Sequence, residues 1–126
     1  MTDSLPFTGE RFIPGPDGEI CYEHWHRYMV AKRFCAGCSV LDAACGEGYG
    51  SNLLADIADE VTGVDISSEA IAHAQGQYQD KDNLTFLQGS CEKLPLLDDS
   101  IDVAVSFETI EHLEAQEQFV RELRRV

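Results

Sequence analysis

A glycine loop and the acid that follows it form the strongest chemical pattern in this sequence. The apolar run 39–44 leads directly into Cys45-Gly46-Glu47-Gly48. Glycines at such positions let the backbone turn tightly and approach a ligand where any Cβ would collide. Asp65 ends the next apolar run, where a carboxylate can accept both hydroxyls of a ribose. The loop and the acid together indicate a site for an adenosine-type ligand.

Two classes of cofactor compete for an adenosine site of this kind. A dinucleotide site needs a third glycine, but the register here reads Gly46-x-Gly48-x-x-Ser51. Asp42 precedes the glycines, and its carboxylate would repel a pyrophosphate. The same carboxylate would attract the ammonium and sulfonium of S-adenosylmethionine. The charge of Asp42 therefore favours the methyl donor over NAD.

A second pattern lies further along the chain, at Glu108, Glu111 and His112. With spacings of i, i+3 and i+4 at the start of an expected helix, the three side chains can share one side of its first turn. They could bind Mg²⁺ or Mn²⁺, or His112 could act as a general base toward a substrate hydroxyl. In a purely structural interpretation, the two glutamates complement the helix dipole and His112 packs. The spacing leaves these interpretations open, with His112 and Glu111 as the catalytic candidates.

The remaining histidines and cysteines form no further site. His24 and His26 are expected on different sides of a helix, and His73 on the solvated surface. Cys35 and Cys38 form a single CxxC with no second ligand pair, which argues against zinc.

Apolar and amphipathic segments alternate along the chain. The strands and helices that these segments predict must position the two groups of residues described above. Residues 1–18 are expected to form an irregular arm, followed by one domain at 19–126. Strands are expected at 39–44, 61–65, 84–88 and 101–107. Helices are expected at 19–34, 49–58, 68–77 with Ser67 as its N-cap, and 109–125 with Ile110, Leu113, Val120 and Leu123 along one stripe. This order predicts an α/β fold: a parallel sheet with helices on both faces.

The composition fits an acidic globular domain. The chain has 126 residues, 44% of them hydrophobic, and a formal net charge of −14. Such a charge repels phosphate backbones and anionic lipids, so we expect neither nucleic acid nor a membrane as a partner. No apolar run approaches the roughly 20 residues of a membrane helix, and the N-terminus lacks the features of a secretion signal. We expect a cytoplasmic protein with reduced cysteines.

Four ordered motifs resemble those of class I S-adenosylmethionine-dependent methyltransferases, of the ubiquinone-biosynthesis type and its small-molecule relatives. The motifs occupy residues 40–48, 61–67, 89–96 with 100–102, and 106–112. The segments 8–14 and 23–28 also look like the lead-in of bacterial methyltransferases found near sugar and surface-polysaccharide enzymes. The resemblance implies a Rossmann-like sheet, the N-terminal half of a seven-stranded fold.

The resemblance also implies which residues hold the cofactor. Asp42 and the glycine loop would hold the methionine part of the cofactor. Asp65 would hold the ribose, and the segment after the third strand would hold the adenine. The family usually has glycine at the position of Ala44, so the alanine side chain crowds the turn. The family usually has an acid at the position of Ser90, so the serine makes a weaker contact with the adenine amino group. The residues expected to bind the cofactor are Asp42, Ala44, Cys45, Gly46, Gly48, Asp65, Ile66, Ser90, Cys91, Glu92 and Phe107.

The resemblance implies a methyltransferase that acts on a small molecule, at a hydroxyl oxygen, with a sugar or glycan precursor as one candidate acceptor. Ubiquinone-type and small-RNA 2′-O-methyltransferases use a similar Glu-x-x-Glu-His on a metal. The alternative is a cofactor-binding module without activity of its own. The family's sheet continues past its fourth strand, whereas this sequence ends at Val126. We therefore expect a fragment that self-associates through the exposed edge of its fourth strand.

Overall fold

The computed structural model describes residues 19–126, in which helices alternate with the first three of four short strands and the third strand is followed by the fourth with no helix between them. The predicted arm at 1–18 lies outside the described residues. In chain order the elements are α1 (Glu19–Lys32), β1 (Ser39–Ala43), α2 (Tyr49–Ala55), β2 (Glu60–Asp65), α3 (Ser68–Gln77), β3 (Leu84–Gln88), β4 (Val103–Val105), the 3-10 turn η1 (Ile110–His112) and α4 (Gln116–Arg125).

The strands form a parallel sheet in the order β3-β2-β1-β4. Val40 of β1 pairs with Val61 of β2 on one side and with Val103 of β4 on the other. The predicted parallel α/β sheet is confirmed. The strand order reverses direction between β1 and β4, and in open parallel sheets ligands bind beyond the carboxyl ends of the strands at such a point.

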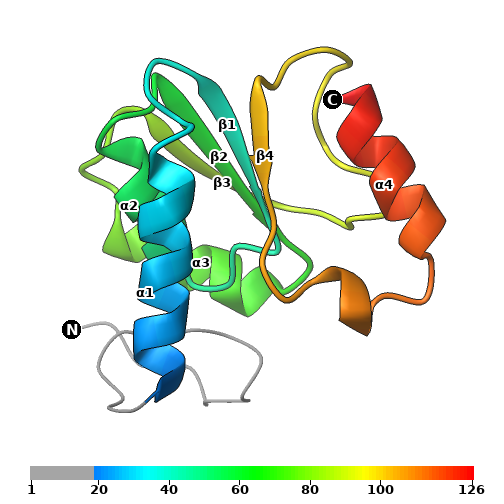
Figure 1. Cartoon of the computed structure of the whole chain (residues 1–126), viewed down its shortest axis with the longest axis horizontal. Helices are drawn as coiled ribbons and strands as arrows, with labels where there is room; N and C mark the ends of the chain where they lie inside the picture. The colour runs from blue at the N-terminus through cyan, green and yellow to red at the C-terminus, as the bar shows by residue number, and fades with distance from the viewer. Residues whose placement is uncertain (1–18) are drawn as a thin grey trace.

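Apolar side chains cover both faces of this sheet. On one face α1 and α2 pack over β1 and β2, with Tyr28, Leu54 and Val61 at the centre (Figure 1). On the other face Phe119 of α4 packs against Leu41 and neighbouring side chains. The alternation of Val40 and Leu41 between the two faces follows from the twofold side-chain period of a strand.

The predicted last helix is wrong in its first half. Instead of one helix over 109–125, the chain forms the short turn η1, extends at Leu113, and begins α4 at Gln116. The break lets Leu113 pack against the same core as Phe119. The Gln116 side chain bonds the Ile110 carbonyl oxygen at 2.9 Å, which satisfies an acceptor that a continuous helix would have used.

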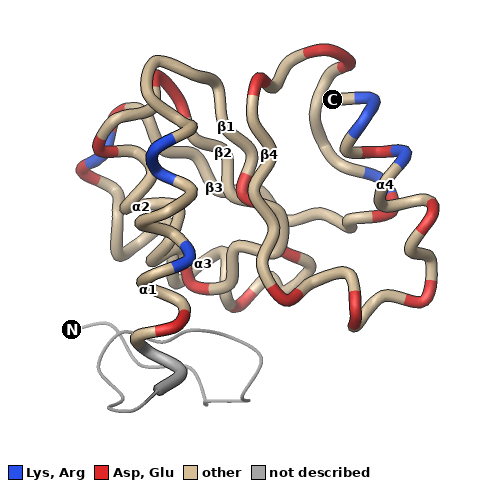
Figure 2. Tube along the Cα trace, in the orientation of Figure 1, with Lys and Arg blue, Asp and Glu red and all other residues tan. Residues whose placement is uncertain are grey.

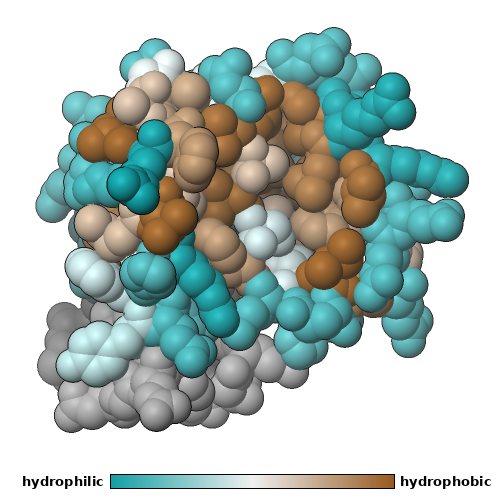
Figure 3. All heavy atoms as spheres, in the orientation of Figure 1, coloured by the Kyte–Doolittle hydropathy of each residue, from teal (hydrophilic) through white to brown (hydrophobic). Residues whose placement is uncertain are grey.

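The fourth strand is shorter than predicted and lies at the edge of the sheet within the described residues. Its central Ala104 is exposed, and hydrophobic residues gather on the molecular face where β4 runs between α1 and α4 (Figure 3). Acidic residues dominate the loops around this face, while basic residues concentrate on α1 and α4 (Figure 2). Self-association through this edge stays a prediction. No helix in the described range is both long and apolar enough to cross a membrane.

Candidate cofactor-binding site

The glycine loop joins β1 to α2 through a series of left-handed turns. Gly46 and Gly48 have φ of 58° and 90°, which glycine adopts without steric cost. A Cβ on Gly48 would also lie 2.6 Å from the Phe86 ring. Ala44 has φ of 61°, a conformation that costs a non-glycine residue about 1 kcal/mol. The crowding that we expected at Ala44 therefore takes the form of a strained backbone conformation at the first residue of the loop.

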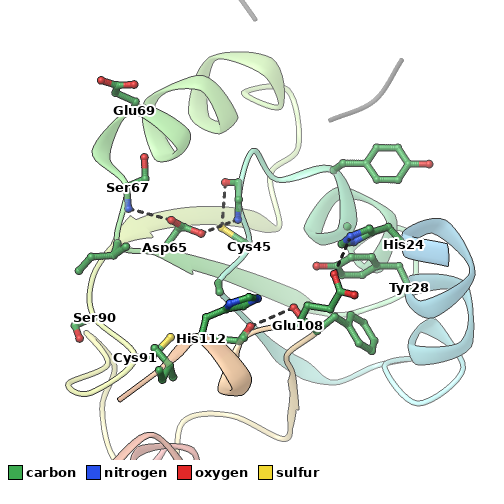
Figure 4. Close-up of a pocket in the computed structure, with 18 of the residues that line it drawn as sticks. His24, Tyr28, Cys45, Asp65, Ser67, Glu69, Ser90, Cys91, Glu108 and His112 are labelled. Atoms are coloured by element: carbon green, nitrogen blue, oxygen red, sulfur yellow. Dashed lines mark hydrogen bonds and ion pairs between the residues drawn. The ribbon is translucent and has the colours of Figure 1, made fainter. Parts of the chain in front are cut away.

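A cavity of about 710 Å³ opens where this loop meets the carboxyl ends of the strands. That volume lies within the range of small-molecule and cofactor pockets. Most of the predicted cofactor residues line it: Ala44, Cys45, Gly46, Asp65, Ile66, Ser90, Cys91, Glu92 and Phe107. Figure 4 shows Ser90 and Cys91 at one end, His24, Tyr28 and Glu108 at the other, and Asp65 between them. The cavity is therefore elongated, with distinct ends.

Asp65 occupies the middle of the cavity at the end of β2. Its carboxylate accepts the backbone N–H of Gly46 and that of Ser67, each at 2.9 Å. These bonds fix the carboxylate between the glycine loop and the start of α3. Because each carboxylate oxygen can accept more than one hydrogen bond, Asp65 retains acceptor capacity for ligand hydroxyls.

Helix α4 holds the segment that forms one end of the cavity. Gln118 donates to the carbonyl oxygen of Glu92, and Glu122 accepts the backbone N–H of Leu94 at 2.7 Å. Arg125 donates to the carbonyl oxygens of Leu94 and Leu96. Side chains distant in sequence therefore fix the position of Ser90 and Cys91.

Asp42 lies beneath the cavity rather than in its wall. Its side chain is completely buried and accepts the Ser51 hydroxyl at 2.7 Å and the Tyr28 hydroxyl at 3.1 Å. Burial raises the pKa of the Asp42 carboxyl to about 7, although both hydroxyl donors oppose the shift. Asp42 is not among the residues described as lining the cavity, and its expected contact with a ligand stays a prediction. Gly48 is also outside this lining.

The raised pKa of Asp42 predicts a pH-dependent stability. Folding favours the protonated carboxyl, so its contribution is complete below about pH 4 and is lost as the pH rises through 7. Asp42→Asn removes this titration and keeps an acceptor for both hydroxyls. The free energy of unfolding of wild type relative to this variant should fall between pH 4 and 7, by at most about 1.4 kcal/mol per pH unit. Urea unfolding of both proteins across this range measures the difference, and a pH-independent difference would contradict the assignment.

Glu108, Glu111 and His112 do not converge. Glu108 has a left-handed backbone with φ of 53°, and its carboxylate is ion-paired with Arg27 at 3.0 Å and His24 at 3.3 Å. His112 lines the cavity, whereas Glu111 is exposed outside it. In the part of the chain that the structure describes, no three His, Cys, Asp or Glu side chains lie close enough to hold a metal. These residues do not fit a metal site as placed, and metal binding stays a prediction.

The contribution of α1 to the site was not predicted from the sequence. His24 and Tyr28 both line the cavity, one helical turn apart. Their i, i+4 spacing was a usable signal, because two such residues share a helix face. Other lining residues that were not predicted are Tyr49, Gly50, Ser67, Glu69, Thr109 and Leu113.

His73 is not the solvated side chain that the sequence predicted. Its Nε2 atom lies 3.0 Å from Oε1 of Glu47, whose side chain is only 3% exposed. The pair ties α3 to the glycine loop.

The wall of the cavity carries an excess of acid. Four carboxylates line it, from Asp65, Glu69, Glu92 and Glu108. Among the described lining residues none is Lys or Arg. Such a wall attracts a cationic ligand and repels a pyrophosphate. The fold and the site thus define an α/β domain of the Rossmann-like class, with an acidic cavity suited to a ligand with positive charge.

Comparisons with known proteins agree with this class. The profile of a family described as "Methyltransferase domain" matches residues 41–126. The chain belongs to this family of methyltransferase domains. It is 44% identical over 128 residues to a protein of Mycolicibacterium smegmatis named as a probable S-adenosylmethionine-dependent methyltransferase, covering all of this chain and 49% of that protein.

Two further relatives extend the comparison. A malonyl-[acyl-carrier protein] O-methyltransferase of Pectobacterium atrosepticum is 32% identical over 91 residues, or 72% of this chain and 35% of that protein. The crystal structure of the PH0226 protein from Pyrococcus horikoshii matches 95% of this chain and 57% of its own, with a TM-score of 0.77 and 31% identity. The chain therefore spans about half the length of the first of these relatives and about a third of the length of the second.

Proposed function

We propose that this protein binds S-adenosylmethionine in the acidic cavity and transfers its methyl group to a small molecule, at a hydroxyl oxygen. The observation that carries the proposal is the combination of the left-handed glycine loop with Asp65 and an acidic wall. Family membership supports the cofactor, and the O-methyltransferase among the relatives supports oxygen as the acceptor atom. A sugar or glycan precursor remains our candidate acceptor.

The residues present fit this cofactor. Asp65 can accept the ribose hydroxyls, and Ile66, which is 68% exposed, offers an apolar surface for the adenine. Cys91 and Ser90 stand at the same end, where a backbone N–H and a hydroxyl can meet the ring nitrogens and amino group. The acidic wall favours the ammonium and the sulfonium over an anionic cofactor.

The main tasks of these side chains are to position the cofactor and the acceptor and to exclude water. The bound cofactor supplies a methyl group already activated by a sulfonium, so an acceptor held in line with it needs little further catalysis. His112 lines the cavity, and in this proposal its imidazole takes the proton of the acceptor hydroxyl. Glu111 is exposed outside the cavity lining, and its catalytic role stays a prediction. The alternative function is a module that binds the nucleoside without transferring a methyl group.

Isothermal titration of the purified chain with S-adenosylmethionine, S-adenosylhomocysteine and NAD tests the cofactor. Both sulfur nucleosides should bind, and NAD should bind more weakly than either because the acidic cavity wall repels its pyrophosphate. Tighter binding of NAD would overturn the proposal. Transfer of a radiolabelled methyl group to a panel of hydroxylated small molecules separates an enzyme from a binding module, since a module binds the donor and labels nothing.

A further inference from the structure

The glycine loop is held by side chains from two elements that follow it in the chain. Asp65, at the end of β2, accepts the backbone N–H of Gly46 at 2.9 Å. At the next loop residue, Oε1 of Glu47 lies 3.0 Å from Nε2 of His73 on α3. Gly46 lines the cavity, whereas Glu47 and His73 are not among its described lining residues. The pair on α3 therefore acts on the cavity wall from behind.

The Glu47 carboxylate is buried with few partners. Its side chain is 3% exposed, compared with 17% for that of His73. Its second oxygen, Oε2, is buried and has no hydrogen-bond partner within the described range of 19–126. A carboxylate that has lost its hydration needs a partner to remain in the interior. Among the described residues, His73 is the partner that Glu47 has.

The same helix also fixes the backbone of the loop. A Cβ on Gly48 would lie 2.9 Å from the Cβ of Ala74, which follows His73 on α3, and 2.6 Å from the Phe86 ring. The loop therefore packs directly on α3 and β3. Because Glu47 lies between Gly46 and Gly48, a carboxylate that moved out to water would draw the backbone of both glycines away from this surface.

We propose that His73 is a positioning residue for cofactor binding: by pairing with the buried Glu47 carboxylate, it keeps the glycine loop in the conformation that forms the cavity wall. His73 touches no ligand in this role. It affects affinity through the fraction of molecules whose loop is competent to bind. The inference rests on the proposed function, because the ligand is taken to be an S-adenosylmethionine-type nucleoside.

Titration calorimetry with S-adenosylhomocysteine tests the proposal in variants of the pair. His73→Leu leaves the Glu47 carboxylate buried without its partner, which favours loop conformations that expose it to water. Affinity should fall by about 10-fold or more, because fewer molecules keep the competent loop. His26→Leu, the same change at an exposed histidine outside the described cavity lining, is the control and should bind like wild type.

Adding Glu47→Met to His73→Leu distinguishes charge pairing from packing. Methionine has a similar length and no charge, so the double variant no longer buries an unpaired carboxylate. It should bind within about 3-fold of wild type, because removing both partners of a buried pair costs less than removing one. Amide hydrogen exchange at residues 45–48 should be faster than wild type in His73→Leu and return toward wild type in the double variant. A loss caused only by missing imidazole packing would persist in the double variant.

Two results would overturn the proposal: a His73→Leu protein that binds as tightly as wild type, or a double variant that binds no better than His73→Leu. If His73→Leu does not fold, thermal unfolding of the double variant decides. A folded double variant supports the pair, and an unfolded one contradicts it. A wild-type protein that does not bind S-adenosylhomocysteine would instead contradict the proposed function, so the two failures are distinguishable.

Discussion

Replacing Asp65 with alanine is expected to abolish most of the affinity for S-adenosylmethionine. The variant loses the acceptor for the ribose hydroxyls, and each charge-assisted bond contributes about 1.5–3 kcal/mol, so affinity should fall by about 100-fold or more. The substitution also frees the backbone N–H groups of Gly46 and Ser67 that Asp65 now accepts. The glycine loop therefore loses an anchor at the same time. Titration calorimetry measures the change.

Asp80→Ala is the matched control for this prediction. Asp80 is exposed in the turn after α3, and its removal should leave affinity unchanged. Thermal unfolding of Asp65→Ala shows whether the variant is folded. A folded Asp65→Ala protein that binds as tightly as wild type would show that the ribose does not lie at Asp65.

Gly50→Ala should be the most destabilising of the conservative substitutions in the site. The new Cβ would lie 2.0 Å from Tyr28, whose ring cannot retreat without losing its bond to Asp42 and its packing on Phe107. Overpacking of this kind costs about 1–3 kcal/mol, and the loss of buried hydrogen bonds adds to it, so we expect about 3 kcal/mol or more. Urea unfolding gives the free energy directly.

Gly76→Ala provides a control with the same chemical change in a helix. A Cβ on Gly76 meets no atom within 4 Å, and alanine favours the helical backbone. This variant should gain about 0.5–1 kcal/mol. If Gly50→Ala were as stable as Gly76→Ala, the packing of α1 against α2 at Tyr28 would be wrong.

The sequence predicted the features of this site that local chemistry specifies. The glycine loop, Asp65 and the parallel sheet follow from residue types and spacing along short segments, and the structure brings the loop and the acid together at the expected edge. The role of α1 could not be predicted in this way. Tyr28 and Glu108 are joined to their partners across 14 and more residues, and only the tertiary fold brings α1 to Asp42 and to the segment after β4.

The last helix shows why periodicity alone misplaced part of the core. The predicted stripe included Val120, which is 52% exposed, while Phe119 is 2% exposed and occupies the core instead. Because the chain is extended at Leu113, the helix that follows turns a different side toward the core than a continuous helix would. Glu122 is buried there as well, because its carboxylate is satisfied by Arg125 and by the backbone of Leu94. A hydrophobicity pattern does not report such partners.

A crystal structure of the protein with S-adenosylhomocysteine tests the central claim most directly. We expect the ribose hydroxyls within hydrogen-bond distance of the Asp65 carboxylate and the adenine against Ile66 and Cys91. Density for the nucleoside outside the cavity, or with its ribose away from Asp65, would contradict the account.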